Sequence, residues 1–180
     1  MIAPVLTTAR LELWRPQATD RDGLFALVAP DAVRRHLGNR PATLADSFAR
    51  LLRNAGSWAL YGYGGFVVRE RGSCKIAGIC GVFHSWRGFA GFDDVPEVGW
   101  IFAEPLWGRG YASEAGTAAL AWFDRAQGPQ RVVCMIEPAN RASLAVAARL
   151  DFVAYGQDTF EGDPVVLLQR APTGSALPGG

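Results

Sequence analysis

The chain has few of the residues that staple small proteins or bind metal ions. Its 180 residues include only three Cys and two His. Cys74, Cys80 and Cys134 are too dispersed for a zinc or redox motif, and His36 and His84 lie far apart. A chain of this length can also build a core without a disulfide or a metal ion. The sequence therefore predicts no metal site.

Long apolar runs and an excess of one charge are also missing. No run approaches the roughly 20 residues of a membrane span, and the N-terminus lacks the charged-then-apolar pattern of a signal peptide. Lys and Arg number 18 against 17 Asp and Glu, so nothing in the charge indicates nucleic-acid binding. We expect a soluble, cytoplasmic protein without membrane or nucleic-acid partners.

What is present is a globular pattern, with 49% hydrophobic residues. The pattern predicts one α/β (α+β) domain over residues 7–171 and a flexible tail over 172–180. Strands are expected at 8–14, 65–70, 75–86, 96–103, 130–137, 152–160 and 164–170. Helices are expected from a cap at Thr19 or Asp20 to Val28, after a cap at Thr43, and at 111–126 and 140–150. This order predicts a mostly antiparallel sheet of about seven strands flanked by about four helices.

One predicted strand, 96–103, runs into a turn that contains Gly108 and Gly110 and opens a long helix. The first turn of a helix has unpaired N–H groups and a positive dipole, and glycine lets the backbone approach a ligand closely. The turn is therefore suited to a diphosphate, with Arg109 as a cation beside it. By itself this Gly-x-Gly fits a plain strand–turn–helix connection equally well. It is neither a Walker loop nor a full dinucleotide-binding fingerprint.

Three segments in order resemble the GNAT superfamily of acetyl-CoA-dependent N-acyltransferases. They are Thr8–Pro16, Trp107–Ala115, and Asn140–Ser143 followed by Phe152. The chain is most similar to the branch of bacterial ribosomal-protein N-terminal acetyltransferases (RimJ/RimL-like), over about residues 7–171. The resemblance implies a GNAT fold with a splay between the fourth and fifth strands. It also implies transfer of an acetyl group to a primary amine by direct attack in a ternary complex, with acetyl-CoA as co-substrate.

The resemblance also implies the site residues. The pantetheine arm would pair with the backbone of Trp100, Ile101 and Phe102. The pyrophosphate would lie on the turn formed by Trp107, Gly108, Arg109, Gly110, Tyr111 and Ala112. Asn140 would contact the cofactor, and Ser143 would face the thiol. Glu97 would take a proton from the amine, directly or through water.

The chain departs from the family pattern at three positions. Trp107 stands where Gln or Arg usually begins the turn, and Asp151 replaces the usual Gly before Phe152. Asp tolerates the left-handed backbone conformation better than most residues, so the fold should survive. Ala147 stands where many relatives carry a Tyr that protonates the leaving thiolate, which leaves Ser143 or water for that role.

Structural alternatives exist for each of these side chains. Glu97 could be a strand residue that faces solvent, Ser143 could bond back to the carbonyl four residues earlier, and Asn140 could only cap its helix. For the whole chain, the alternatives are a CoA-binding or toxin-neutralising module with little turnover and a nucleotide-binding protein. Cys134 is expected to be a core residue rather than a nucleophile.

The acceptor is the least determined part of the prediction. Two segments expected to flank the cleft are rich in aromatic and acidic residues, namely Tyr61, Tyr63, Trp86, Phe89, Phe92, Asp93 and Asp94. Aromatic walls with carboxylates suit a cationic amine such as a peptide N-terminus, a polyamine or an aminoglycoside. A hydrophobic core explains some of the aromatics equally well. The sequence does not distinguish a monomer from a homodimer.

Overall fold

The computed structural model describes residues 3–38 and 41–172, so nearly all of the expected tail lies outside the described residues. The strands are β1 (Leu6–Thr7), β2 (Leu11–Trp14), β3 (Gly65–Glu70), β4 (Ile76–Phe83), β5 (Glu97–Phe102), β6 (Val132–Ile136), β7 (Val153–Phe160) and β8 (Asp163–Arg170). The helices are α1 (Arg21–Val28), α2 (Asp31–Arg34), α3 (Leu44–Tyr61), α4 (Tyr111–Gln127) and α5 (Arg141–Arg149). None of the described helices is long and apolar enough to cross a membrane.

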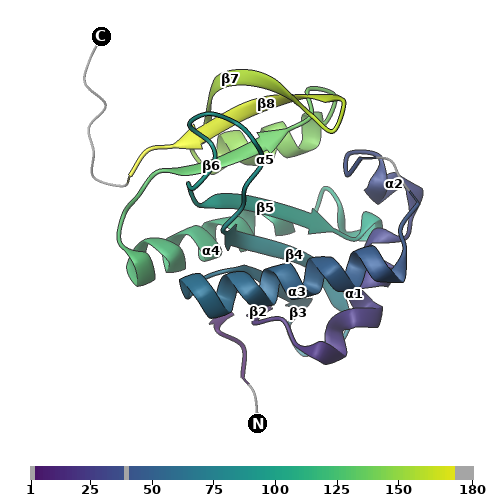
Figure 1. Ribbon diagram of the computed structural model, residues 1–180. Coiled ribbons are helices and arrows are strands. Elements are labelled where there is room, and N and C mark those ends of the chain that lie inside the picture. Colours follow the sequence, from purple (N-terminus) through teal and green to yellow (C-terminus); the bar gives the residue numbers. More distant parts are fainter. Residues whose placement is uncertain (1–2, 39–40, 173–180) are drawn as a thin grey trace.

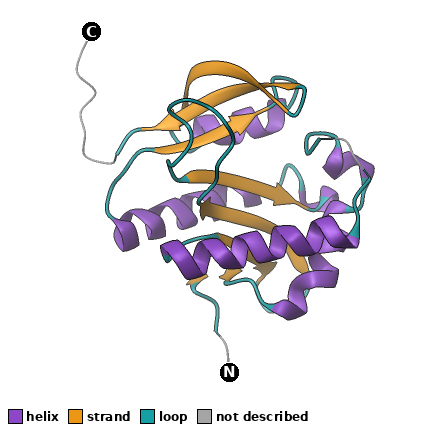
Figure 2. Cartoon of the chain, viewed as in Figure 1, coloured by secondary structure: helices purple, strands orange, loops and turns teal. Residues whose placement is uncertain are grey.

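The strands form one sheet in the order β1-β2-β3-β4-β5-β6-β8-β7. All neighbouring pairs are antiparallel except β5 and β6, which run parallel. Helices cover both faces of this sheet (Figures 1 and 2). The predicted mixed α/β domain is confirmed, with eight strands and five α-helices among the described residues.

The alternation of side chains along β3 sorts the helices onto the two faces. Val67 packs with Leu24 of α1 and Leu51 of α3. Its neighbours Phe66 and Val68 point the other way and pack with the start of α4. The helix α5 shares the α4 face, because its Ala147, together with Leu150 directly after the helix, joins a cluster with Leu120 and Phe123 of α4.

The sheet opens between β5 and β6. The only residue pair that joins these two strands in the described part of the chain is Glu97 with Val133, next to one hydrogen bond of 2.9 Å from Val133 N to Pro96 O. The other edge of β5 is paired with β4 along its whole length. From Val98 onward β5 and β6 therefore diverge (Figure 1), and the predicted splay between the fourth and fifth expected strands is confirmed.

Local signals for helix ends and tight turns are also confirmed. The Thr43 hydroxyl accepts a hydrogen bond from the N–H of Asp46 and caps α3, which ends at Gly62 in the left-handed conformation. Asp151 has a φ of 63°, so an L-residue does occupy the left-handed position that follows α5. The Asp20 carboxylate instead accepts bonds from the N–H of Gln17 and from Arg69, although Asp20 does lie at the start of α1.

The sequence prediction is wrong at two short elements and at several strand boundaries; the expected strand 8–14, for example, begins only at Leu11. The two-residue strand β1 and the one-turn helix α2 were not expected, because neither is long enough to show a periodic pattern. The expected strand 75–86 ends at Phe83, which pairs with Glu97. The residue before Glu97 is Pro96, whose nitrogen cannot donate to a sheet, so the ladder stops there. Residues 84–86 consequently form a loop beside the opening.

Candidate active site

A tight turn at the end of β5 carries the predicted phosphate site. Beyond β5, the Trp107 indole N–H donates to the carbonyl of Phe102 at 2.8 Å and folds the chain back. Gly108 and Gly110 then take φ values of 72° and 78°, and Gly110 caps the N-terminus of α4. A Cβ built on Gly108 would meet no atom within 4 Å, so the backbone there is open. The N–H groups of the first turn of α4 have no partner within the helix. The turn can therefore accept an anion.

A network of hydrogen bonds anchors this turn to the start of β2. The Arg10 guanidinium donates to the Arg109 carbonyl at 2.8 Å and to the Glu114 carboxylate at 2.7 Å. Glu114 also accepts bonds from the Thr8 hydroxyl at 2.6 Å and from the N–H of Arg10 at 3.0 Å. Burial opposes the ionisation of Glu114, but the bonds from Thr8 and Arg10 outweigh it and lower the pKa of the carboxyl group. The segment that contains Thr8 and Arg10 thus fixes the geometry of the glycine turn before α4.

Arg109 and Tyr111 lie beside the turn in a second polar group. The Tyr111 hydroxyl donates to Glu70 at 2.6 Å, and this hydrogen bond raises the pKa of Tyr111. The Arg109 guanidinium lies 5.0 Å from the centre of the Tyr111 ring and 3.7 Å from the Glu70 carboxylate. Because its ring is buried, Tyr111 can offer a ligand its backbone N–H rather than its hydroxyl. Arg109 remains half-exposed as the cation of the turn.

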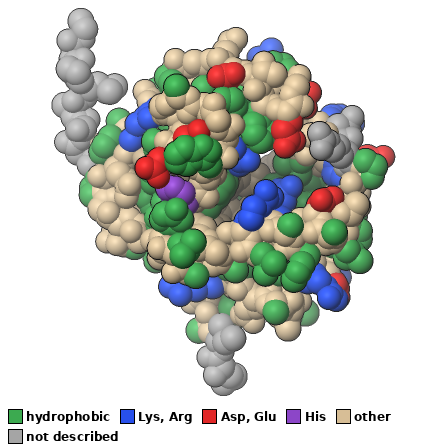
Figure 3. All heavy atoms as spheres, viewed as in Figure 1, with side chains coloured by type: hydrophobic (Ala, Val, Ile, Leu, Met, Phe, Trp, Pro, Cys, Tyr) green, Lys and Arg blue, Asp and Glu red, His purple; other side chains and the backbone are tan. Residues whose placement is uncertain are grey.

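A cleft extends through the splay of the sheet. A cavity of about 660 Å³ lies between α3, the loop after β4 and β5. A second cavity of about 600 Å³ lies between β5, β6 and the start of α5. The two cavities share lining residues from β5 and from α3, which makes them one continuous cleft. Figure 3 shows the hollow on the α3 face, with basic side chains beside it.

Trp100, Ser143 and Asn140 meet on the α5 side of the cleft. The Trp100 indole N–H donates to the Ser143 hydroxyl at 3.3 Å. The Asn140 side chain accepts from the N–H of Ser143 at 3.1 Å, so Asn140 does cap α5. Since capping uses only the side-chain oxygen, contact between Asn140 and the cofactor stays a prediction. Trp100 is one of the β5 residues whose backbone is predicted to pair with the pantetheine arm. Its contact with Ser143 shows that this part of β5 faces α5.

Glu97 lies on the opposite side of the same strand and is 4% exposed. The alternative that it faces solvent is therefore wrong. Arg87 donates to both of its carboxylate oxygens, at 2.9 and 3.0 Å, and the Ser85 hydroxyl donates to Oε2. Both carboxylate oxygens of Glu97 therefore already accept hydrogen bonds, and the sequence analysis did not predict these partners. Ser85 and Arg87 carried no recognisable sequence signal because they lie in the loop after β4.

Two further positions belong to the core. Ala147 is fully buried in the cluster between α4, α5 and β6, so the place of the family's Tyr is filled by packed side chains. Cys134 is buried in the same cluster, and burial together with the nearby Glu97 raises the pKa of its thiol. The expected core role of Cys134 is confirmed. Within the described chain, no three His, Cys, Asp or Glu side chains lie close enough together to hold a metal ion.

The residues expected to line the acceptor cleft divide into two groups. Phe89 and Phe92 pack in a buried cluster with Val133 and strand β8, and the buried Tyr63 packs against Phe123. Asp93 accepts bonds from the N–H groups of Arg87 and Gly88 and so fixes the loop. These four therefore do not line the cleft. Those that do line it are Tyr61, Trp86 and Asp94.

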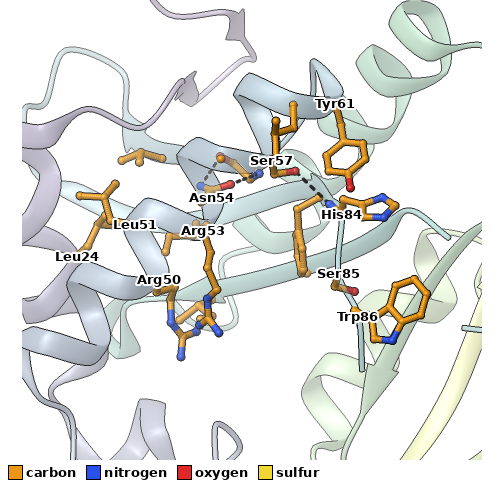
Figure 4. A pocket seen from close by; sticks show the side chains of 18 of the residues that line it. Leu24, Arg50, Leu51, Arg53, Asn54, Ser57, Tyr61, His84, Ser85 and Trp86 are labelled. Carbon is orange, nitrogen blue, oxygen red and sulfur yellow. Dashed lines mark hydrogen bonds between the residues drawn. The ribbon is translucent and has the colours of Figure 1, made fainter. Parts of the chain in front are cut away.

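His84 connects these lining residues. Its ring stacks on Tyr61 at a centroid distance of 4.0 Å, and its two nitrogens lie 3.3 Å from the Tyr63 hydroxyl and 3.2 Å from Asp94. Its backbone N–H donates to the Ser57 hydroxyl, the bond drawn as a dashed line in Figure 4. His84 therefore forms part of the cleft wall, which agrees with its expected place near the end of a strand.

Comparisons with known proteins agree with this geometry. The family model of the acetyltransferase (GNAT) domain matches residues 10–153. A putative GNAT-family acetyltransferase from Bordetella pertussis superposes with a TM-score of 0.83 and 37% identity, covering 92% of this chain and 98% of that one. RimL, a ribosomal L7/L12 α-N-protein acetyltransferase solved with coenzyme A, superposes with a TM-score of 0.73 and 19% identity over 96% and 99% of the two chains. YkkB of Bacillus subtilis is 26% identical over 147 residues, 81% of this chain and 83% of its own length.

Proposed function

The chain belongs to the GNAT acetyltransferase family, and from this premise we propose that it is an N-acetyltransferase that transfers the acetyl group of acetyl-CoA to a primary amine. One observation carries the proposal: the sheet opens between β5 and β6 next to a glycine turn that begins a helix. The fold is one that binds acetyl-CoA, and RimL has been solved with coenzyme A. At 19% identity, that likeness concerns the fold alone.

Binding of acetyl-CoA would use the backbone of β5 and the turn that follows it. The edge of β5 beyond Glu97 is unpaired toward β6, so an extended pantetheine arm can bond to it like an added strand. The pyrophosphate would lie on the N–H groups from Gly108 to Ala112, where the dipole of α4 favours negative charge. Asn140 and Ser143 line the same part of the cleft.

Removal of the amine proton would run through Ser85 to Glu97. The amine must lose a proton to form an amide, and Glu97 is a buried carboxylate that lines the cleft. Its two oxygens are held by Arg87 and Ser85, so direct contact with the amine would require a bond to break. The Ser85 hydroxyl donates to Glu97 and keeps lone pairs with which to accept a proton from the amine.

Ser143 is the side chain best placed to protonate the leaving thiolate. Its oxygen accepts a bond from Trp100, which leaves the hydroxyl proton free to be donated into the cleft. A free thiol has a pKa of about 8.5, so an unprotonated thiolate already leaves tolerably near neutral pH. The contribution of Ser143 is therefore modest, at most the about 100-fold low end of general acid catalysis.

A second candidate is a CoA-binding module with little turnover. Two observations favour it: the indole of Trp107 is bonded to Phe102, and Ala147 leaves no acid at the family's usual position. A screen of amine acceptors with detection of the free thiol separates the two functions. Thiol release that depends on both acetyl-CoA and an amine supports the enzyme. If acetyl-CoA binds tightly but no amine causes release of the thiol, the CoA-binding module is the function that remains.

The roles of Ser85 and Glu97 are tested by their variants. Glu97→Gln and Ser85→Ala should each lower kcat about 10-fold or more, with little change in KM for acetyl-CoA, because both act on the amine side. The loss should shrink at high pH, where more of the amine is already neutral. Wild-type kcat in both variants at saturating acceptor would exclude the relay.

A further inference from the structure

The α3 face of the cleft carries more positive charge than the sequence predicts. Arg50 and Arg53 of α3 and Arg87 of the loop after β4 all line the cavity. Arg50 and Arg53 are three residues apart, so they lie on neighbouring positions of one helix face. Figure 4 shows their side chains pointing the same way, into the cavity.

Arg87 is neutralised, but the two arginines of α3 are not. Arg87 forms a two-bond ion pair with Glu97. Across the described part of the chain, Arg50 and Arg53 form no hydrogen bond or ion pair with a carboxylate. Asp46, one helical turn before Arg50, is bonded to Thr43. The Asp46 carboxylate attracts Arg50 without bonding to it, so two guanidinium groups with no bonded carboxylate face the cavity.

Among the described residues, the acidic side chains around the cleft form no ion pair with Arg50 or Arg53. Asp94 is held by His84 at 3.2 Å, and Glu137 is bonded to His36. Glu161 and Asp163 are exposed on the β7–β8 hairpin and line the second cavity. Burial, followed by repulsion from Arg53 and Arg87, outweighs the attraction of Asp46 and lowers the pKa of Arg50. The partly buried Arg50 therefore lies close to like charges, and a bound anion would offset their repulsion.

Acetyl-CoA is not placed to supply that anion. Its pyrophosphate would lie on the Gly108–Ala112 turn at the start of α4, on the other face of the sheet from α3, and the ribose 3′-phosphate lies beyond the pyrophosphate, farther along the molecule from the thioester. Only the neutral pantetheine arm and the thioester would pass between β5 and β6. The α3 side is then left to the acceptor.

We propose that the acceptor amine carries a second, anionic group, a carboxylate or a phosphate, which Arg50 and Arg53 bind while the amine reaches the thioester. The proposal rests on the N-acetyltransferase function and specifies its substrate class. Guanidinium groups bind such oxyanions through paired, charge-assisted hydrogen bonds. The exposed Trp86 and the half-exposed Tyr61 offer apolar surface at the rim for the body of the substrate. The cationic acceptors expected from the sequence, polyamines and aminoglycosides, would be repelled at this wall.

The test uses matched pairs of acceptors that differ only in the anion. One arm compares ω-amino acids of increasing chain length with their primary amides, and the other compares phosphoethanolamine with ethanolamine. The anionic member should have a kcat/KM at least about 10-fold higher in one arm, which identifies the anion as carboxylate or phosphate. Equal rates, or a preference for the neutral member in both arms, would overturn the proposal while leaving the N-acetyltransferase function intact.

The variants Arg50→Gln and Arg53→Gln, alone and together, connect the preference to these side chains. The ratio of rates for the anionic and neutral members should fall toward one in the double variant. Arg125→Gln is the matched control, because Arg125 is an exposed arginine of α4 outside the cleft. A ratio that persists in the double variant overturns the proposal.

A binding measurement covers the case in which no amine is acetylated. With CoA saturating, the N-acetylated form of an anionic acceptor should raise Tm in the wild type and in Arg125→Gln. It should not do so in the Arg50→Gln/Arg53→Gln double variant. The N-acetylated primary amide of the same acceptor lacks the anion. If it raises Tm of the wild type as much as the anionic form does, the arginines do not bind the anion. This readout needs no turnover, so it separates a failure of the acceptor assignment from a failure of the proposed reaction.

Discussion

Replacing Gly110 by Val tests whether the turn before α4 is the phosphate site. Gly110 has φ 78° and ψ 7°, a conformation that costs an L-residue about 1–2 kcal/mol. Its added Cβ would lie 3.5 Å from the Arg10 guanidinium, which is ordinary contact, so the two γ-methyl groups must press on Arg10 or extend into the turn. Gly110→Val should therefore fold with a reduced Tm and lose the binding of acetyl-CoA.

Gly62 provides a control with the same backbone cost. It ends α3 with φ 77° and ψ 4°, and it lies outside both cavities of the cleft. Because 1 kcal/mol corresponds to about 2–4 °C in a protein of this size, Gly62→Val and Gly110→Val should each lower Tm by about 2–8 °C. Acetyl-CoA at 100 times its Kd adds about 2.7 kcal/mol, so it should raise Tm of the wild type and of Gly62→Val by about 5–11 °C.

The comparison of the two variants decides the outcome. Acetyl-CoA should leave Tm of Gly110→Val nearly unchanged, and calorimetry with CoA should give no measurable Kd for it. If Gly110→Val binds acetyl-CoA as tightly as Gly62→Val, the backbone of this turn does not hold the pyrophosphate. The assignment of the turn as the pyrophosphate site would then be wrong, whatever the activity of either variant.

Three other predictions follow from single contacts. Asp151→Gly should raise the free energy of unfolding by about 1 kcal/mol in urea titrations, because the left-handed position after α5 suits Gly; an unchanged or lower stability would refute this. Ala147→Tyr should destabilise by about 1–3 kcal/mol or more and fail to raise kcat, because Ala147 is fully buried; a stable, faster variant would refute the packing. The pKa of Glu114 is lowered from its ordinary value of 4.5, so its stabilising contribution is present above that value and is lost as the pH falls through the folded-state pKa. Tm of Glu114→Gln should therefore fall less than that of the wild type on acidification below that value, and parallel pH profiles would contradict it.

Features fixed by a few neighbouring residues could be predicted from the sequence. The Gly108 and Gly110 turn, the Thr43 cap and the left-handed Asp151 all follow from the conformational preferences of single residues. The order of strands and helices followed from hydrophobic period. Hydrophobic period was imprecise at strand ends that depend on pairing between strands. Strand β4 ends at Phe83, which pairs with Glu97, so its limit is set by strand β5.

The acceptor side could not be predicted in the same way. Phe89 and Phe92 lie in an irregular loop, where no period indicates whether an aromatic ring is buried, and both are core residues. Arg50 and Arg53 lie beside the buried stripe of α3, where arginines commonly extend into solvent. A signal was present in hindsight: Ser57 and Tyr61 share that flank of the helix, and all four side chains line the cavity.

The alternation of β5 explains why the sequence motifs lie on one side of the sheet and the arginines of α3 on the other. Val98, Trp100 and Phe102 pack toward α4 and α5, which carry the glycine turn, Asn140 and Ser143. Gly99 and Ile101 face α3 and its arginines instead. Successive side chains of one strand thus line two different surfaces, which are connected where β5 and β6 separate. The residues by which the family is recognised after β5 lie on the surface that we propose binds acetyl-CoA. We propose that the acceptor binds the opposite surface, where the charge of α3 is the feature to test.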